Sequence, residues 1–235
     1  LDVDTGAERI ILDELQRAFP TYSVLSEEGG AENTPTSYQW IVDPLDGSAN
    51  FQHSNPTFGI ALCLAVEQEP VMSVVYLPTR GELFEAVRGA GAKCNGKPIH
   101  VSTVDALGDA IIHFGDFDKS GRHEANRERI AIMTRLADVA GRVRMIGTAA
   151  TDVAYVASGR ADGLIMSNRN PWDYQAGKLL ITEAGGSSSL VERSAQNGFV
   201  ILSNTFLHHA LVHLVTTATT NPSHASKGSE ITVAQ

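Results

Sequence analysis

The chain has few cysteines, no long apolar run and no excess of positive charge, and each shortage excludes a class of protein. Its 235 residues include only two cysteines, Cys63 and Cys94, without the C-x-x-C spacing of a zinc or redox site. We expect both to be reduced thiols in a cytoplasmic protein, with a disulfide between them as the alternative. No stretch approaches the roughly 20 apolar residues of a membrane span, and we expect no signal peptide. The formal net charge of −9 argues against a nucleic-acid or anionic-membrane surface.

Fingerprints of several large enzyme classes are also missing. The sequence contains no P-loop, no HExxH, no GxSxG and no Rossmann glycine pattern. Hydrolysis of nucleoside triphosphates, zinc-dependent peptide cleavage and acyl-serine chemistry therefore have no support in the sequence.

The apolar residues that are present, within a hydrophobic share of 43%, predict a sizeable α/β core. A capping box formed by Thr5 and Glu8 predicts the start of the first helix. The periodic patterns predict helices over 5–19, 123–140, 148–159, 171–186 and 205–217, and strands over 37–42, 57–66, 71–78, 81–88, 109–115, 143–146, 162–167 and 198–204. We predict an N-terminal half over 1–104 carrying most metal ligands, a C-terminal half over 105–217, and a flexible polar tail over 218–235.

Acidic side chains gather at the ends of these elements rather than on helix faces. They comprise Asp4 before the first helix, Glu27 and Glu28 in "SEEGG", Asp43 and Asp46 after the strand "WIV", and Asp173 at the start of a helix. Each has an ordinary explanation alone: a turn, a solvated loop, or a carboxylate favoured by the helix dipole. Together they favour a site for a hard divalent cation such as Mg²⁺, with the plain turn as the alternative.

A phosphate site would also need hydrogen-bond donors, and two glycine-containing turns offer them. "GSAN" follows Asp46 and can direct the N–H groups of Gly47 and Ser48 toward an anion. "GTAA" at 147–150 offers the hydroxyl of Thr148, for which an ordinary helix N-cap is the competing interpretation.

The motifs "SEEGG", "WIVDPLDGSANF", "GELFEAVRGAGAKCNGKPIHVS", "GTAATDVAYVASGRADG" and "NPWDYQAGKLLITEAGG" resemble those of the inositol monophosphatase family. They cover most of residues 1–205, in the family's order. The resemblance implies a layered αβαβα sandwich and Mg²⁺-dependent, lithium-sensitive hydrolysis of a small phosphate monoester by a metal-activated water. It also implies a homodimer.

The resemblance further implies a role for each matching residue. Glu27, Asp43 and the carbonyl of Leu45 would hold a first Mg²⁺, Asp43, Asp46 and Asp173 a second, and Glu27 a weaker third. Asp4 and Ser48 would orient the water. Gly47, Ser48 and Thr148 would bind the phosphate. Asp46, Ala149, Met166 and Arg169 would contact the rest of the substrate. Glu28 would support the metal ligands without binding the metal itself.

One departure from the family bears on the substrate. Animal-type enzymes carry a substrate-binding glutamate where this chain has Met166, and a thioether cannot accept strong hydrogen bonds from a sugar ring. Histidinol phosphate, a nucleotide, another sugar phosphate, and a fructose or adenosine bisphosphate therefore stay open as substrates. A binding or regulatory protein with little turnover is the non-enzymatic alternative.

Overall fold

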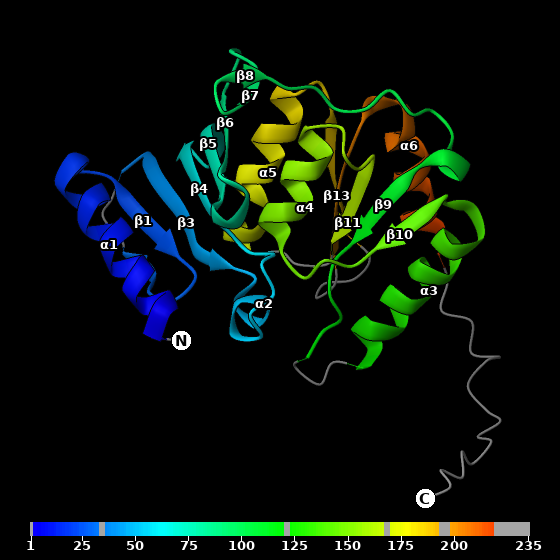
Figure 1. The fold of residues 1–235 in the computed structure, drawn as a ribbon, viewed down its shortest axis with the longest axis horizontal. Helices are drawn as coiled ribbons and strands as arrows, with labels where there is room; N and C mark the ends of the chain where they lie inside the picture. Colours follow the sequence, from blue (N-terminus) through cyan, green and yellow to red (C-terminus); the bar gives the residue numbers. More distant parts are fainter. Residues whose placement is uncertain (1, 33–35, 120–122, 167–169, 193–197, 219–235) are drawn as a thin grey trace, which may run out of the picture.

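The structure is a computed structural model. It describes residues 2–32, 36–119, 123–166, 170–192 and 198–218. Its elements form five layers, seen edge-on in Figure 1: a helix, a large sheet, two helices, a smaller sheet and two outer helices. This arrangement confirms the expected αβαβα sandwich.

The first sheet has eight strands in the order β2-β1-β3-β4-β5-β6-β7-β8. Their bounds are β1 (Ser23–Ser26), β2 (Gly30–Glu32), β3 (Tyr38–Asp46), β4 (Gly59–Val66), β5 (Glu69–Leu77), β6 (Glu82–Val87), β7 (Ala92–Cys94) and β8 (Lys97–Pro98). Strands β4, β5 and β6, all three predicted, form an antiparallel meander. Strands β1, β2, β7 and β8 were not predicted from the sequence. β3 is buried along most of its length because helices cover both of its faces.

Helix α1 (Asp2–Ala18) covers the outer face of this sheet. Its apolar stripe, which includes Leu12 and Leu15, packs against Val24 and Trp40. The predicted capping box is wrong, because the helix starts before Thr5. Asp4 consequently lies inside the helix rather than ahead of it.

The second sheet has five strands in the order β10-β9-β11-β13-β12. Their bounds are β9 (Ile111–Phe114), β10 (Arg142–Arg144), β11 (Gly163–Met166), β12 (Ser187–Glu192) and β13 (Gly198–Ser203). β9 runs parallel to β10 and β11, while β13 is antiparallel to β11 and β12. Strand β12 was not predicted. Helices α3 (His123–Val139) and α6 (Thr205–Thr217) pack on the outer face.

Helices α4 (Ala149–Ala157) and α5 (Pro171–Glu183) lie between the two sheets (Figure 1). A glycine allows them to pack closely, since a methyl group at Gly177 would stand 2.3 Å from Val153 Cγ1. Both helices contact strands of the two sheets, so the residues on either side of the predicted 104/105 boundary share one core. The 104/105 boundary stays a prediction, and the predicted tail over 218–235 lies, after Ala218, outside the described residues. Within the described residues, no helix has the length and apolarity needed to cross a membrane, and Cys63 and Cys94 are free thiols.

Candidate functional site

A bulge in β3 brings two aspartates to one side of the sheet. Asp43 pairs with Ala61 and Asp46 with Gly59, so β3 carries one residue more than β4 between these pairs. Side chains three positions apart in a regular strand point to opposite faces, and the extra residue cancels that alternation. Pro44 fits here because a bulge does not require its missing N–H. The Leu45 N–H donates a 3.2 Å hydrogen bond to Asp43 Oδ1, which fixes that carboxylate.

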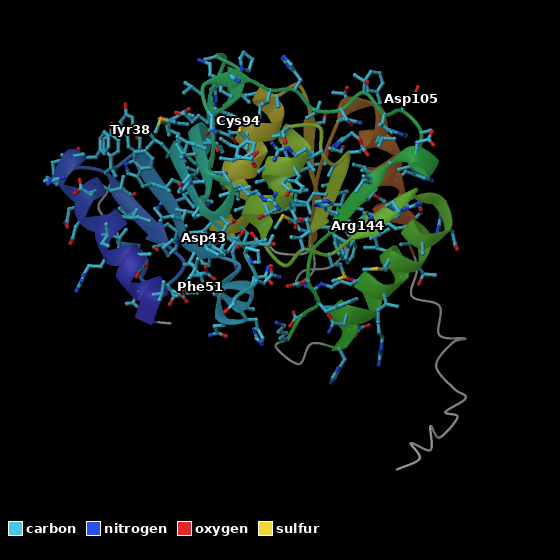
Figure 2. All side chains as sticks on the ribbon, in the orientation of Figure 1. Tyr38, Asp43, Phe51, Cys94, Asp105 and Arg144 are labelled. Carbon is cyan, nitrogen blue, oxygen red and sulfur yellow. The ribbon has the colours of Figure 1, made fainter. Side chains whose placement is uncertain are left out.

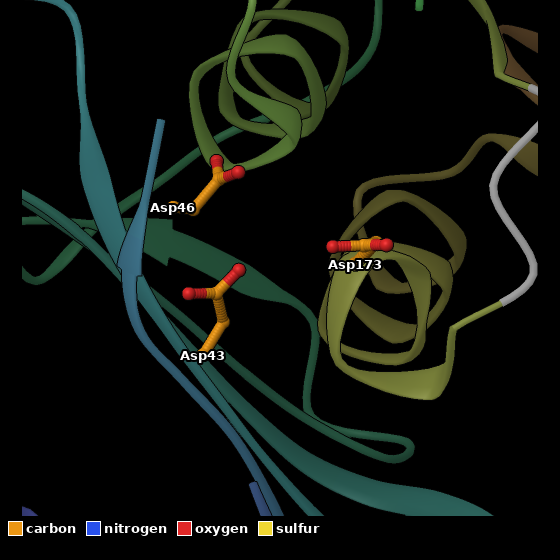
Figure 3. A group of neighbouring side chains, drawn as sticks. All are labelled: Asp43, Asp46 and Asp173. Carbon is orange, nitrogen blue, oxygen red and sulfur yellow. The ribbon is translucent and has the colours of Figure 1, made fainter. Parts of the chain in front are cut away.

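Helix α5 supplies a third carboxylate to the same place. Asp173 lies in its first turn, as predicted, after the Asn170 N-cap and Pro171. One oxygen from each of Asp43, Asp46 and Asp173 lies within 4.8 Å of the others. Figure 3 shows the three side chains around a common space, two from β3 and one from α5. Residues 130 positions apart in the chain therefore form one acidic cluster.

Asp46 is held by the start of helix α4. Its Oδ2 accepts hydrogen bonds from the Thr148 hydroxyl and the Ala150 N–H, each 2.5 Å long. The Thr148 Oγ1 also accepts a 3.3 Å bond from Thr151 N–H, so Thr148 is an N-cap as well. The prediction of an N-cap at Thr148 is thus correct, and the Thr148 hydroxyl also donates a hydrogen bond to Asp46, a carboxylate of the acidic cluster.

Glu27 lies beside the cluster rather than within it. Its N–H donates to Val42 O at 3.2 Å, which extends the pairing of β1 with β3 by one residue. Its carboxyl group shares a hydrogen bond with that of Asp43. Buried Asp4 acts on Glu27 through its charge, so the structure brings these three acids close together. Glu28 is exposed in the same loop and is not among the clustered residues.

Glu8 holds this loop in place, a contact that the sequence analysis missed. Its Oε1 accepts hydrogen bonds from the Ser26 hydroxyl and the Gly29 N–H. The partners lie 18 and 21 residues away, so local spacing could not predict them. Glu8 thereby fixes the chain on both sides of Glu27.

Burial and mutual repulsion raise the pKa values of Glu27, Asp43, Asp46 and Asp173. Burial, and then the charges of Asp46 and Glu27, raise the pKa of Asp43 to about 10. Burial and the same two charges raise the pKa of Asp173 to about 8. For Asp46, burial raises the pKa despite the hydrogen bonds from Thr148 and α4.

These shifts fit a cation site, because a bound cation stabilises the ionised carboxylates that repel each other without it. The donor set is all oxygen, which is what Mg²⁺ prefers. Asp43, Asp46 and Asp173 are therefore suited to hold Mg²⁺. The ligand roles of Glu27 and the Leu45 carbonyl stay predictions.

A cavity of about 380 Å³ adjoins the cluster. It is lined by Asp46, Gly115, Asp116, Phe117, Asp118, Lys119, Arg129, Gly147, Thr148, Ala149, Asp152, Met166 and Asp173. The predicted substrate residues Asp46, Ala149 and Met166 are thus brought to one cavity. Arg169 lies outside the described residues.

Gly47 and Ser48 lie at the cluster's edge, where the short helix α2 (Ser48–Gln52) begins. Gly47 has φ 87°, a left-handed conformation that favours glycine, and a methyl group there would stand 3.0 Å from Thr148 Cβ. The glycine therefore allows the turn after β3 to pack against the turn before α4.

Several cavity residues were missed in the sequence, although the same strand-end argument applies to them. "GDFD" directly follows the predicted strand over 109–115 and places Asp116 and Asp118 in the cavity wall. Asp152 also lines the cavity, and its Oδ1 lies 2.7 Å from His113 Nδ1 in a buried pair. Burial raises the pKa of Asp152 to about 6, although the His113 hydrogen bond acts in the opposite direction.

Comparisons with known proteins assign the chain to a family. The profile described as "Inositol monophosphatase family" matches residues 2–225. The chain is 40% identical to the inositol-1-monophosphatase of Rhizobium meliloti (strain 1021), over 90% of this chain and 80% of that protein. It is 38% identical to the Nus factor SuhB of Escherichia coli (strain K12), over 79% and 69% respectively. The solved inositol monophosphatase of Anabaena (Nostoc) sp. PCC 7120 superposes with a TM-score of 0.85 at 33% identity, covering 92% of this chain and 86% of that one. This chain belongs to the inositol monophosphatase family.

Proposed function

We propose that the chain hydrolyses phosphate monoesters of small alcohols in a Mg²⁺-dependent reaction. The observation that carries the proposal is the convergence of Asp43, Asp46 and Asp173 within 4.8 Å beside an open cavity. One solved relative, 28% identical with a TM-score of 0.76, is described as an IMPase/NADP phosphatase complexed with Mg²⁺ and phosphate. That description supports the same cation here and the same product, inorganic phosphate.

The position of each residue indicates its proposed role in the reaction. Asp43, Asp46 and Asp173 would hold Mg²⁺, and Asp43 also shares a hydrogen bond with Glu27, so it would be the ligand shared if a second ion bound beside Glu27. Bound Mg²⁺ supplies an activated water and neutralises charge on the ester. Ser48, at the start of α2, and buried Asp4 would orient the attacking water toward phosphorus.

The phosphate would lie against the two turns that Gly47 brings together. The N–H groups of Gly47 and Ser48 are the donors available there, while the Thr148 hydroxyl donates to Asp46. The alcohol half would then extend into the cavity past Ala149 and Met166. This direction is set by the cavity, which continues from Asp46 and Thr148 toward β11.

Phosphate release tests the proposal. The assay uses inositol, sugar, histidinol and nucleotide phosphates, with Mg²⁺ and with EDTA, on protein shown to be folded by circular dichroism. We expect Mg²⁺-dependent release from at least one ester and its loss in Asp43→Asn. An exposed aspartate outside the site, Asp105, provides the matched control Asp105→Asn. Absence of release from every ester by folded, Mg²⁺-loaded protein would refute the proposal.

A binding role is the second candidate, and the name of one relative favours it. The 38% identical protein of Escherichia coli is called a Nus factor, a name that does not describe a phosphatase. The complete acidic cluster and its cavity support catalysis in this chain instead, because a binding role alone would not require them. The turnover assay separates the two candidates.

A further inference from the structure

Three carboxylates line the cavity outside the metal cluster, and two of them have cationic or basic partners. Asp118 Oδ2 lies 3.8 Å from the guanidinium of Arg129. Asp152 is hydrogen-bonded to His113. Asp116 differs, since no described residue makes a hydrogen bond or an ion pair with its side chain. Among the described residues, none competes for its carboxylate with a molecule in the cavity.

The backbone fixes where Asp116 stands. Strand β9 runs parallel to β11, and the pairing continues past Phe114 because the Gly115 N–H donates to Ile165 O at 2.9 Å. A methyl group at Gly115 would stand 3.1 Å from Met166 Cβ and 3.2 Å from Met166 Cα. This close contact favours glycine at 115, and the next residue, Asp116, lines the same cavity as Met166.

Asp116 also lies near the turn that precedes α4. Its Oδ2 would be 3.6 Å from a methyl group placed on Gly147. Its charge reaches both Asp46 and Asp152 and acts on their carboxylates. The Asp116 carboxylate thus lies near the Gly147 turn and lines, with Met166, the cavity that the alcohol half of an ester would occupy.

We infer that Asp116 recognises the alcohol half of the substrate by accepting hydrogen bonds from its hydroxyl or ammonium groups. The inference rests on the proposed function and deepens it. Met166 cannot do this task, because its thioether is a weak acceptor. The charge of Asp116 also opposes a second phosphate in the cavity, so the preferred ester has a donor-bearing, non-anionic alcohol.

Steady-state kinetics of Asp116→Ala and Asp116→Asn test the inference on four esters. Inositol 1-phosphate carries hydroxyl donors, histidinol phosphate carries an ammonium group, fructose 1,6-bisphosphate carries a second phosphate, and phenyl phosphate has no donor on its alcohol. A lost hydrogen bond to a charged acceptor corresponds to a loss of about 10- to 100-fold. We expect Asp116→Ala to reduce kcat/KM by that factor on the preferred donor-bearing ester, mainly through KM.

The other esters and variants provide the controls. On phenyl phosphate, kcat/KM should change by about twofold at most. On the donor-bearing ester, the kcat/KM of Asp116→Asn should fall between those of wild type and Asp116→Ala, because the amide oxygen still accepts hydrogen bonds. The kcat/KM on fructose 1,6-bisphosphate should rise in both variants. Asp105→Ala should match wild type on all four esters, since Asp105 is exposed and Figure 2 shows it at the upper right of the molecule, well away from Asp43. The ester that loses most identifies the donor as hydroxyl or ammonium.

Equal losses on all four esters would overturn the inference while leaving the phosphatase proposal intact. Absence of turnover by the wild type would instead refute the proposed function. Asp116 would then be judged by calorimetric binding of the same esters in the presence of Ca²⁺. Unchanged affinity of Asp116→Ala for both donor-bearing esters would overturn the inference by that route also.

Discussion

Asp46 Oδ2 accepts two hydrogen bonds, one from the Thr148 hydroxyl and one from the Ala150 N–H. Thr148 lies 102 residues further along the chain than Asp46. These bonds join the bulged end of β3 to the first turn of α4. An acid whose pKa is raised by burial thus lies at the positive end of a helix dipole. One side chain therefore positions a candidate metal ligand and connects the two predicted halves of the fold.

Asp46→Ala should destabilise the metal-free protein more than Asp46→Asn. Both variants remove the same charge, but only alanine leaves the Thr148 hydroxyl and the Ala150 N–H without an acceptor. The loss should be about 1–3 kcal/mol in the free energy of unfolding. Urea denaturation in EDTA measures it, and equal stability of the two variants would show that these bonds do not matter.

The metal-free protein should lose stability as the pH rises. The folded-state pKa values of Asp43, about 10, and Asp173, about 8, lie above 3.8, the ordinary pKa of an aspartate in an unfolded chain. The folded protein therefore retains protons that the unfolded chain has released, and the slope of stability against pH is negative. The stabilisation is fully present below about pH 4 and is lost as the pH rises through 8 and 10. Each retained proton contributes up to about 1.4 kcal/mol per pH unit.

Mg²⁺ should reverse this pH dependence, because binding ionises the carboxylates and releases their protons. Denaturation curves in EDTA and in saturating Mg²⁺ between pH 5.5 and 8 check both slopes. Calorimetry in buffers of different ionisation enthalpy counts the released protons. Metal binding at pH 6 without proton release would contradict the raised pKa values.

Gly47→Ala should lower stability and turnover more than Gly81→Ala, although both glycines have a positive φ. Gly47 and Gly81 both have positive φ, 87° and 60°, so alanine is strained at either position by about 1–2 kcal/mol. A methyl group at Gly81 meets nothing within 4 Å, whereas at Gly47 it stands 3.0 Å from Thr148 Cβ. We expect Gly47→Ala alone to displace Thr148 and to lower turnover by about tenfold or more. Matching stability and turnover in the two variants would refute the packing argument.

The sequence predicted the parts of the fold whose signals are local. β4, β5 and β6 were found because apolar residues alternate or run together between turn residues. The short strands β1, β2 and β12 were missed, since "SVLS", "GAE" and "SSSLVE" carry little apolar pattern and are ordered by the strands beside them.

In the site, too, only the features with local sequence signals could be predicted. Asp43, Asp46 and Asp173 could be predicted to converge from their places at element ends. The loop contact of Glu8 could not, because "TGAE" fits a capping box equally well and the competing partner, Ser26, is close only in the folded chain.

Glu8→Ala should weaken Mg²⁺ binding without touching a ligand. Loss of the Ser26 and Gly29 hydrogen bonds frees the loop that carries Glu27. Activity should fall at limiting Mg²⁺ and recover when Mg²⁺ is raised. Glu14→Ala, an exposed change on the same helix, is the matched control. A loss that saturating Mg²⁺ does not restore would show a role other than holding this loop.

Met166→Glu should compensate for the loss of Asp116. Met166 is buried at the end of β11, and its backbone already contacts Gly115, so a glutamate there would present its carboxylate to the same part of the cavity. In the wild-type background the new charge lies beside Asp116, and repulsion limits the gain on inositol 1-phosphate. In the Asp116→Ala background that repulsion is absent, and we expect recovery of about tenfold in kcat/KM on the donor-bearing ester. Mg²⁺ affinity should stay unchanged in all variants. A double-mutant cycle measures the coupling, and strictly additive effects would show that the two positions do not serve the same substrate groups.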